Sequence, residues 1–316
     1  MQIKAPFRQT QPAPPAGGKR PPVAVELAAE GALAAAHTAA GQPVTHAFVP
    51  LAPGALIPGI AESNIHSAVS VTDALRSALD QVAPGRKYVT LVVPDTSARV
   101  FVLDFDSLSN KPVEALPVLR FRLRKMVPFD VETAAVSFQV LPAPTDGAYD
   151  AGTGAIRVLA IVMPGPILAE YESAVRAAGY EPGAVLPSSL ASLAALASGE
   201  PALTANLSNL ALTTSVTRGD DLLLYRTVEL PMDNAARVAE VQRSIAVASA
   251  WFEDHLGRTP REIYYGGAID PHDFARAVDD PQLSIRELAP VPAIGALSPL
   301  GPIGFAAVNG ALAGAA

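Results

Sequence analysis

The chain has 316 residues, half of them hydrophobic but only 6% aromatic, with a net charge of −7 and no cysteine. This length permits a large aliphatic core in two domains, or in one domain with an insertion. The acidic balance argues against a nucleic-acid surface, and the lack of cysteine excludes structural disulfides and thiolate metal sites.

The N-terminal segment, residues 1–22, is polar and rich in Pro, Gln and Gly. It cannot bury much apolar surface, so we expect a disordered Pro-rich tail. It also lacks the apolar core of a signal peptide, and no apolar run in the chain approaches the ~18 residues that cross a bilayer. We therefore expect a cytoplasmic protein that reaches a membrane only through partners.

The remaining chain alternates between strand and helix patterns. Three strands and a helix are predicted first, at 23–27, 32–38, 44–51 and 70–82. Two strands, a helix and two strands follow, at 87–93, 99–105, 113–127, 136–141 and 156–163. Next come two helices and a hairpin, at 166–178, 185–198, 207–217 and 221–230. The last elements alternate helix and strand, at 234–256, 261–265, 274–278, 284–288 and 305–315.

Residues 88–141 form the most informative segment of this pattern, a β-β-α-β module. Pro128 lacks an N–H and restricts the residue before it, so the helix should end near Val127. A peptide could add to a strand edge of the module and contact the helix end at Arg124, Val127, Pro128 and Phe129. The alternative reading is that Val127 and Phe129 belong to the buried core.

Several motifs occur in a fixed order along the chain and resemble one family. They are Leu91-Val-Val-Pro-Asp95, Val127-Pro-Phe129 with Phe138-Gln-Val-Leu141, Ala177-Ala-Gly-Tyr-Glu-Pro182 with Leu186-Pro-Ser-Ser-Leu190, Val241-Gln-Arg-Ser-Ile245 and Ile263-Tyr-Tyr-Gly-Gly267. The ordered set resembles PilM, the cytoplasmic actin-like protein of type IV pilus assembly, and more distantly FtsA. The type II secretion protein GspL is a related alternative.

The resemblance implies a mixed α/β, actin-like (ribonuclease H-like) fold of two lobes. The first lobe would comprise 23–86 and 164–203, the inserted module 87–163, and the second lobe 204–316. The resemblance also implies binding of the cytoplasmic N-terminal peptide of a PilN-like inner-membrane protein beside the module. Other pilus-machine proteins are further expected partners, and a homo-oligomer or ring is an expected assembly. Members of the family bind ATP between the lobes.

The positions that would hold ATP depart from the family pattern. Each lobe should offer a D-x-G hairpin turn, in which Asp directs the metal and Gly lets backbone N–H groups approach the phosphates. The degenerate ATP positions are Glu26, Ala28, Thr213, Thr214, Gly266 and Gly267. In addition, 229–237 leads almost directly into the next helix, so an outer subdomain of the second lobe is predicted to be missing.

The sequence therefore predicts a scaffold protein of a pilus or related secretion machine, a pseudo-ATPase without catalytic residues and without a cofactor. An ATP-binding protein whose partner binding is switched by Mg-ATP is the alternative. The five histidines lie apart without ligand spacing, so no metal site is expected. For Asp95, Asp104 and Asp106, turn roles are favoured over a carboxylate cluster.

Overall fold

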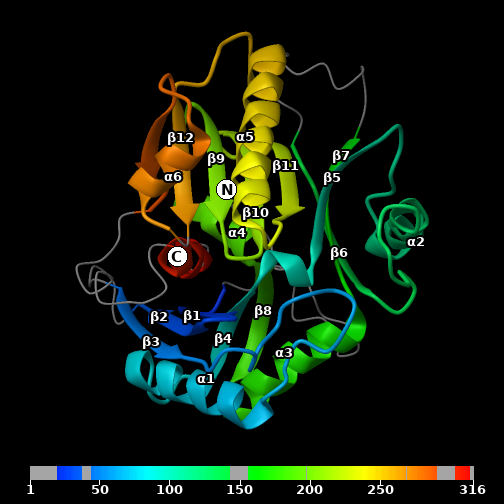
Figure 1. Cartoon of the computed structure of the whole chain (residues 1–316). Coiled ribbons are helices and arrows are strands. Elements are labelled where there is room, and N and C mark those ends of the chain that lie inside the picture. Colours follow the sequence, from blue (N-terminus) through cyan, green and yellow to red (C-terminus); the bar gives the residue numbers. More distant parts are fainter. Residues whose placement is uncertain are drawn as a thin grey trace.

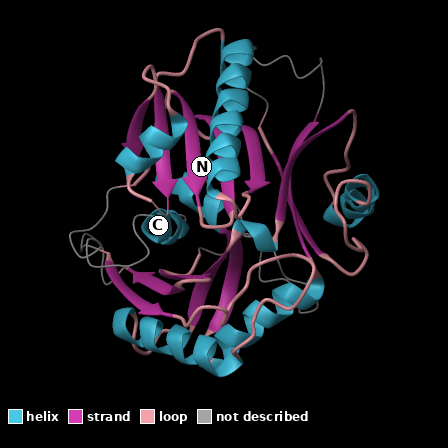
Figure 2. Ribbon diagram, in the orientation of Figure 1, coloured by secondary structure: helices cyan, strands magenta, loops and turns pink. Residues whose placement is uncertain are grey.

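The computed structural model describes residues 20–37, 44–142, 156–196, 198–267, 269–289 and 303–313. Within these ranges the chain forms three sheets with helices packed on them (Figures 1 and 2). The predicted N-terminal tail lies almost wholly outside the described residues, and residues 143–155 and 290–302 also lie outside them.

The first lobe is a five-stranded sheet in the order β3-β2-β1-β4-β8. Its strands are β1 (Val23–Ala28), β2 (Gly31–Ala36), β3 (Thr45–Pro50), β4 (Tyr88–Val93) and β8 (Glu181–Pro187). The first three are antiparallel, whereas β1, β4 and β8 are parallel. Helices α1 (Ala68–Val82) and α3 (Gly165–Ala177) cover the lower face in Figure 1, where Val71, Leu75 and Leu79 of α1 are buried.

The second lobe repeats this topology. Its sheet has the order β11-β10-β9-β12-β13, and its strands run in the same relative directions as their first-lobe counterparts. The strands are β9 (Pro201–Leu207), β10 (Ala211–Arg218), β11 (Asp221–Glu229), β12 (Glu262–Gly267) and β13 (Ser284–Glu287). The two lobes are thus structural repeats, although no repeat is visible in the residues.

Two helices pack on the second-lobe sheet, α5 (Asn234–Leu256) and α6 (Pro271–Val278). The Asp233 carboxylate caps α5 by accepting a hydrogen bond from the backbone N–H of Ala236. Gly257 ends the helix with a left-handed φ of 65°, which glycine adopts without strain. Residues 230–233 alone join β11 to α5, so no subdomain intervenes at this point.

The inserted module has its own sheet and its own core. It consists of β5 (Arg99–Phe105), α2 (Pro112–Leu123), β6 (Ala135–Val140) and β7 (Ile156–Met163), with strand order β5-β7-β6. The predicted module boundary at residue 87 is too early, because β4 pairs with β1 and β8 in the first-lobe sheet. Helix α2 is also shorter than predicted, since it ends at Leu123 and turns follow to Pro128.

The helix predicted at 185–198 is wrong. Strand β8 continues to Pro187 and is followed by the short α4 (Ser188–Ser192) and the 3-10 turn η2 (Leu193–Ala195). The Ala- and Leu-rich composition of this segment favours a helix, but Val185 and Leu186 are fully buried beside β4. Tertiary pairing in the sheet therefore overrides the local helix propensity.

Helix α7 (Ile303–Ala313) lies between the two sheets, where Figure 1 views it end-on. It was predicted within the second lobe, but its side chains Ala307, Val308 and Leu312 join the first-lobe core. It packs closely on α4, because a Cβ added at Gly310 would lie 2.0 Å from the carbonyl oxygen of Ala191. In the described part of the chain, no helix combines the length and apolar character that a membrane span requires.

Candidate functional site

The two hairpin turns that would clamp a nucleotide contact each other. One is the β1–β2 turn at Ala29 and Glu30, and the other is the β9–β10 turn at 208–210. Because the lobes share one topology, both turns point toward the seam between them. The side-chain amide of Asn209 donates a hydrogen bond of 2.5 Å to the Glu30 carboxylate. A direct hydrogen bond thus joins the two turns.

The second-lobe turn also uses its own backbone amides. The Ser208 hydroxyl accepts hydrogen bonds from the N–H groups of Leu210 (3.2 Å) and Ala211 (2.9 Å). Arg237 of α5 fixes the other side of the turn by donating to the carbonyls of Ser208 (2.9 Å) and Asn209 (2.7 Å). A phosphate-binding turn needs amides that are free to point at the anion. At Leu210 and Ala211 these amides already have an acceptor.

Glu26, which stands where the first lobe should carry its metal-directing Asp, is buried in β1 with 5% of its surface exposed. Its Oε1 accepts a hydrogen bond of 2.7 Å from the Ser188 hydroxyl of α4. Burial raises the pKa of Glu26 to about 8, and the nearby Asp95 and Glu30 also raise it, while the Ser188 hydrogen bond opposes them. Near neutral pH the side chain is therefore mostly uncharged and poorly suited to attract a cation.

Asn206 is the second-lobe counterpart of Glu26, and sequence reasoning missed it. In the parallel ladders, Glu26 lies opposite Val92 of β4, and Asn206 lies opposite Gly266 of β12. Both partners are the last but one residue of their strands, so the two positions match. Asn206 is buried and donates to the Ser192 hydroxyl at 3.1 Å. An amide replaces the carboxylate here, and finding it required the recognition of β9.

The other predicted nucleotide positions pack or form hydrogen bonds within the fold. Thr213 and Thr214 lie inside β10 rather than at its turn, and the Thr213 hydroxyl bonds that of Thr227 across the sheet at 2.8 Å. Gly266 has ordinary packing, since an added Cβ would lie 3.7 Å from the Cβ of Ala306. At Gly267 an added Cβ would overlap the Tyr265 hydroxyl, at 1.6 Å. Gly267 therefore leaves room for the Tyr265 side chain, whereas Gly266 does not need to be a glycine for packing.

A second carboxyl, the half-buried Asp95, links both lobes. It accepts hydrogen bonds from the backbone N–H of Ser189 (3.0 Å), from the Ser189 hydroxyl and from the Tyr225 hydroxyl of β11 (3.4 Å). Burial raises the pKa of Asp95 to about 6, against the effect of these donors. Asp104 is exposed on β5, and within the described ranges no three His, Asp or Glu side chains converge as a metal site requires.

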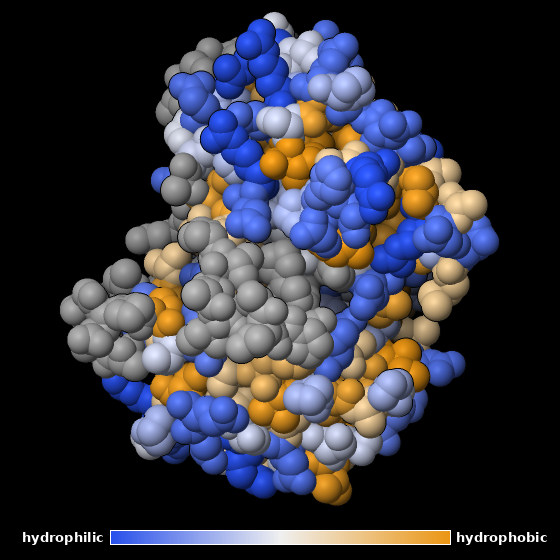
Figure 3. Space-filling model, turned by 60° about the vertical axis from the view of Figure 1, so that its left-hand side comes forward, coloured by the Kyte–Doolittle hydropathy of each residue, from blue (hydrophilic) through white to orange (hydrophobic). Residues whose placement is uncertain are grey.

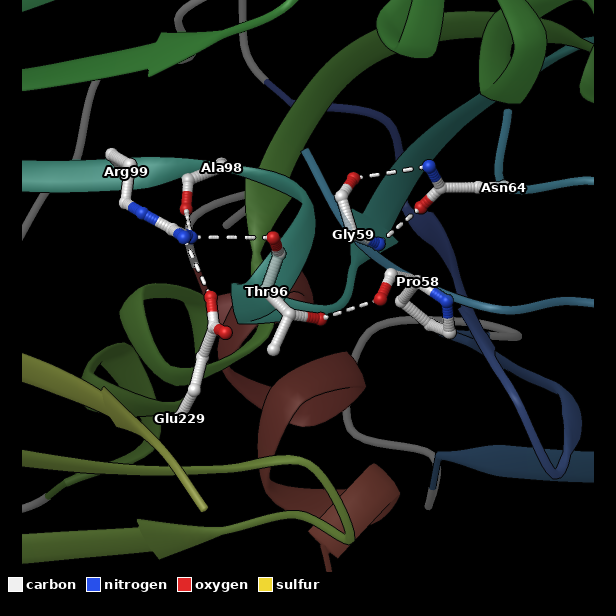
Figure 4. Close-up of polar contacts among 7 residues, drawn as sticks. All are labelled: Pro58, Gly59, Asn64, Thr96, Ala98, Arg99 and Glu229. Atoms are coloured by element: carbon white, nitrogen blue, oxygen red, sulfur yellow. Dashed lines mark hydrogen bonds and ion pairs between the residues drawn. The ribbon is translucent and has the colours of Figure 1, made fainter. Parts of the chain in front are cut away.

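The inserted module also contacts the second lobe. Arg157 of β7, only 3% exposed, donates to the carbonyls of Leu222 (2.7 Å) and Leu223 (3.2 Å) in β11. At the other end of β11, Arg99 of β5 pairs with Glu229 at 2.6 Å. Figure 4 shows the Arg99 guanidinium reaching Glu229 beside the turn that carries Thr96. The module therefore bridges the two lobes.

Of the four predicted partner-binding residues, one is buried. Val127 belongs to the module core, because the turn after α2 folds back and its N–H bonds the carbonyl of Leu123. Phe129 is half-buried against the same core. Pro128 and Arg124 are exposed, and Arg124 pairs with Glu132 at 2.6 Å. A docked peptide could contact Pro128, Arg124 and one side of Phe129, but Val127 is an unsuitable contact.

Comparison with known proteins establishes the fold. No family model matches the chain, and no curated protein matches it. A PilM–PilN type IV pilus biogenesis complex has a TM-score of 0.70 at 17% identity, over 93% of this chain and 98% of that chain. The cytoplasmic domain of EpsL, an inner-membrane component of the type II secretion system of Vibrio cholerae, has a TM-score of 0.52 at 16% identity, over 92% and 94%. The predicted two-lobed actin-like fold of PilM type is thereby confirmed.

Proposed function

We propose that this actin-like protein is a cytoplasmic scaffold of a type IV pilus or related secretion machine, held at the inner membrane by a PilN-like protein. The observation that carries the proposal is an inserted module with its own core beside a nucleotide clamp closed by Asn209 and Glu30. The PilM of the solved complex, which shares the fold, is bound to PilN. We infer that this chain likewise takes a short peptide.

The peptide would bind at the module. Strand β6 has β7 on one side and no second neighbour among the described strands, so its backbone can accept an added strand. Exposed Pro128 and half-buried Phe129 lie in the turn that leads toward β6 and offer apolar contacts. Arg124 in the same turn offers a cation.

We also propose that the protein does not bind a nucleotide between its lobes. A triphosphate and its Mg²⁺ need free turn amides and a charged carboxylate between the lobes. Ser208 occupies the amides of Leu210 and Ala211, Glu26 is largely neutral, and Asn206 is an amide. No residue in this arrangement is placed to orient an attacking water, so we propose a pseudo-ATPase.

Isothermal titration calorimetry tests both parts. The expected result is no heat of binding with Mg-ATP, and saturable binding of a synthetic peptide that spans the cytoplasmic N-terminus of the neighbouring PilN-like protein. Phe129→Asp should weaken the peptide at least about tenfold, because it places a charge against an apolar contact. Val247→Asp, at an exposed apolar position on α5, is the matched control and should leave the affinity unchanged.

Two outcomes would overturn the proposal. Micromolar binding of Mg-ATP would contradict the pseudo-ATPase assignment. Undiminished peptide affinity in a folded Phe129→Asp variant would contradict the groove. Binding of a peptide from a secretion-system partner, without binding of the pilus peptide, would assign the chain to a secretion machine.

A further inference from the structure

Helix α2 of the module is apolar on two sides. Its inner side buries Ala115, Leu119 and Leu123 against the module sheet. On the outer side Val118 is 46% exposed and Phe121 is 66% exposed. A surface helix normally has one apolar stripe, directed at its own core. A second apolar stripe on a helix of this length indicates a second surface that packs on it.

Nothing in the described structure covers this outer side. Helix α2 lies on the face of the module sheet that points away from β11, at the edge of the molecule (Figure 1). The face seen in Figure 3 mixes hydrophilic and hydrophobic residues over both lobes. On the outer side of α2, Val118 and Phe121 are three residues apart and therefore lie on the same side of the helix.

The apolar stripe, Val118 and Phe121, has an acidic residue at one end and basic residues at the other, so two antiparallel copies would pair opposite charges. Glu114, Val118, Phe121 and Lys125 are spaced by four, three and four residues, so they share one side of the helix and of the turn that extends it. The acid lies at the N-terminal end, where it contacts exposed Lys111 at 2.9 Å. The C-terminal end is basic, and Arg122 and Lys125 make no ion pair with any described residue.

We propose that a second copy of this chain covers the stripe, with the two α2 helices packed antiparallel. The midpoint of the stripe lies between Val118 and Phe121, so rotation by 180° places each Phe121 on the Val118 of the other copy. The same rotation places each Glu114 opposite Lys125 of the other copy. Within one chain these two residues are about 16 Å apart along the helix axis. Such an interface is isologous and closes as a dimer. The antiparallel helix dipoles also favour it.

The other occupants fit less well. An anionic bilayer or an acidic partner would attract Arg122 and Lys125 but would repel Glu114 on the same side. Phe and Arg are enriched at protein interfaces, which favours a protein occupant. One helix pair buries less than the ~1,200–2,000 Å² of a stable interface, so the dimer is weak and concentration-dependent.

Sedimentation velocity and equilibrium of the full chain test the proposal. The wild type should form a dimer whose population grows with concentration, and Phe121→Asp should be monomeric. Glu114→Lys and Lys125→Glu should each weaken the dimer about fivefold to tenfold, because each creates two like-charge contacts. Val247→Asp on α5 is the control and should dimerise like the wild type.

Mixing supplies the decisive arm. In an antiparallel dimer, an equimolar mixture of Glu114→Lys and Lys125→Glu restores both opposite-charge contacts, so the mixture should dimerise more strongly than either variant alone. A mixture no stronger than its components overturns the proposal, as does a wild type that remains monomeric up to ~1 mM. The proposal would also be overturned if the wild type stayed monomeric and bound phosphatidylglycerol vesicles, and if Lys125→Glu abolished this binding. The stripe would then be assigned to a membrane. Peptide binding at Phe129 is a separate readout, so either proposal can fail alone.

Discussion

Two carboxyl groups, the buried Glu26 and the half-buried Asp95, lie at the seam between the lobes, and α4 supplies hydroxyl donors to both. Ser188 donates to Glu26, and Ser189 donates to Asp95. A buried carboxyl that is protonated avoids the cost of an unpaired charge. Near neutral pH Glu26 is therefore mostly protonated, whereas Asp95, whose pKa is about 6, is mostly ionised and is stabilised by its hydrogen-bond donors.

This arrangement predicts a pH-dependent stability. The folded state raises the pKa of Glu26 from 4.5 to about 8, so between these values it holds a proton that the unfolded chain has released. The free energy of unfolding should consequently fall as pH rises from about 5 to 8. Glu26→Gln, which mimics the protonated form, should flatten this fall and be more stable than wild type at pH 8.

Thermal unfolding at pH 5 to 8.5 measures the difference between the two profiles. Glu62→Gln, at an exposed position, should follow the wild-type profile. Parallel curves for wild type and Glu26→Gln would contradict the assignment. Asp95, whose pKa is raised to about 6, contributes at lower pH and remains in both proteins.

At the same scale, Glu26 and Ala28 could be predicted from the sequence as the first-lobe turn positions. A hairpin with short strands can be recognised from neighbouring residues alone. It did not locate Asn206, because its equivalence to Glu26 depends on the register of β9 against β12. Val127 was ambiguous for a similar reason. Whether an apolar residue after a helix points inward depends on the turn, and that turn folds Val127 into the module core.

Among the elements, those with a clear local signal were predicted well. Helix α5 begins and ends where the capping Asp233 and Gly257 predict. The segment that became β8, α4 and β9 was predicted poorly, because small residues favour a helix in isolation. Its structure depends on the pairing of β8 with β4 and of β9 with β12. These pairings involve distant residues, so they cannot be read from the segment itself.

The close contact between α7 and α4 gives a prediction at this scale. Gly310→Ala adds a Cβ that would lie 2.0 Å from the carbonyl oxygen of Ala191, so the helices must separate. Alanine favours a helix over glycine by up to about 1 kcal/mol, but the lost packing should dominate. We expect the free energy of unfolding in urea to fall by about 1–3 kcal/mol.

The matched control for this substitution is Gly59→Ala, because a Cβ there meets nothing within 4 Å. Its stability should be unchanged or slightly higher than that of the wild type. Equal stability of the Gly310→Ala variant would mean that α7 can move away from α4 without cost.

At the scale of the whole molecule, α4, α7 and the module join the two lobes. The two-lobed, actin-like class was predictable from the repeated order of hairpins and helices together with the ordered motifs. The bridging role of the module was not predictable, because the contact of Arg157 with Leu222 and Leu223 joins residues far apart in the sequence.

Breaking that bridge should loosen the module without unfolding either lobe. Arg157→Met keeps the apolar stem but leaves two β11 carbonyls without this donor, so we expect a loss of about 1–3 kcal/mol. Hydrogen–deuterium exchange should speed up in β7 and β11 but not in β1 or β2. Arg86→Met, at an exposed turn, is the control, and equal exchange in the two variants would contradict the bridge.

The direct contact between Asn209 and Glu30 has a consequence for regulation. On the proposed function, the angle between the lobes does not respond to the energy charge of the cell, because no metabolite sits between the two hairpins. Control of this protein must then come from the abundance and occupancy of its protein neighbours.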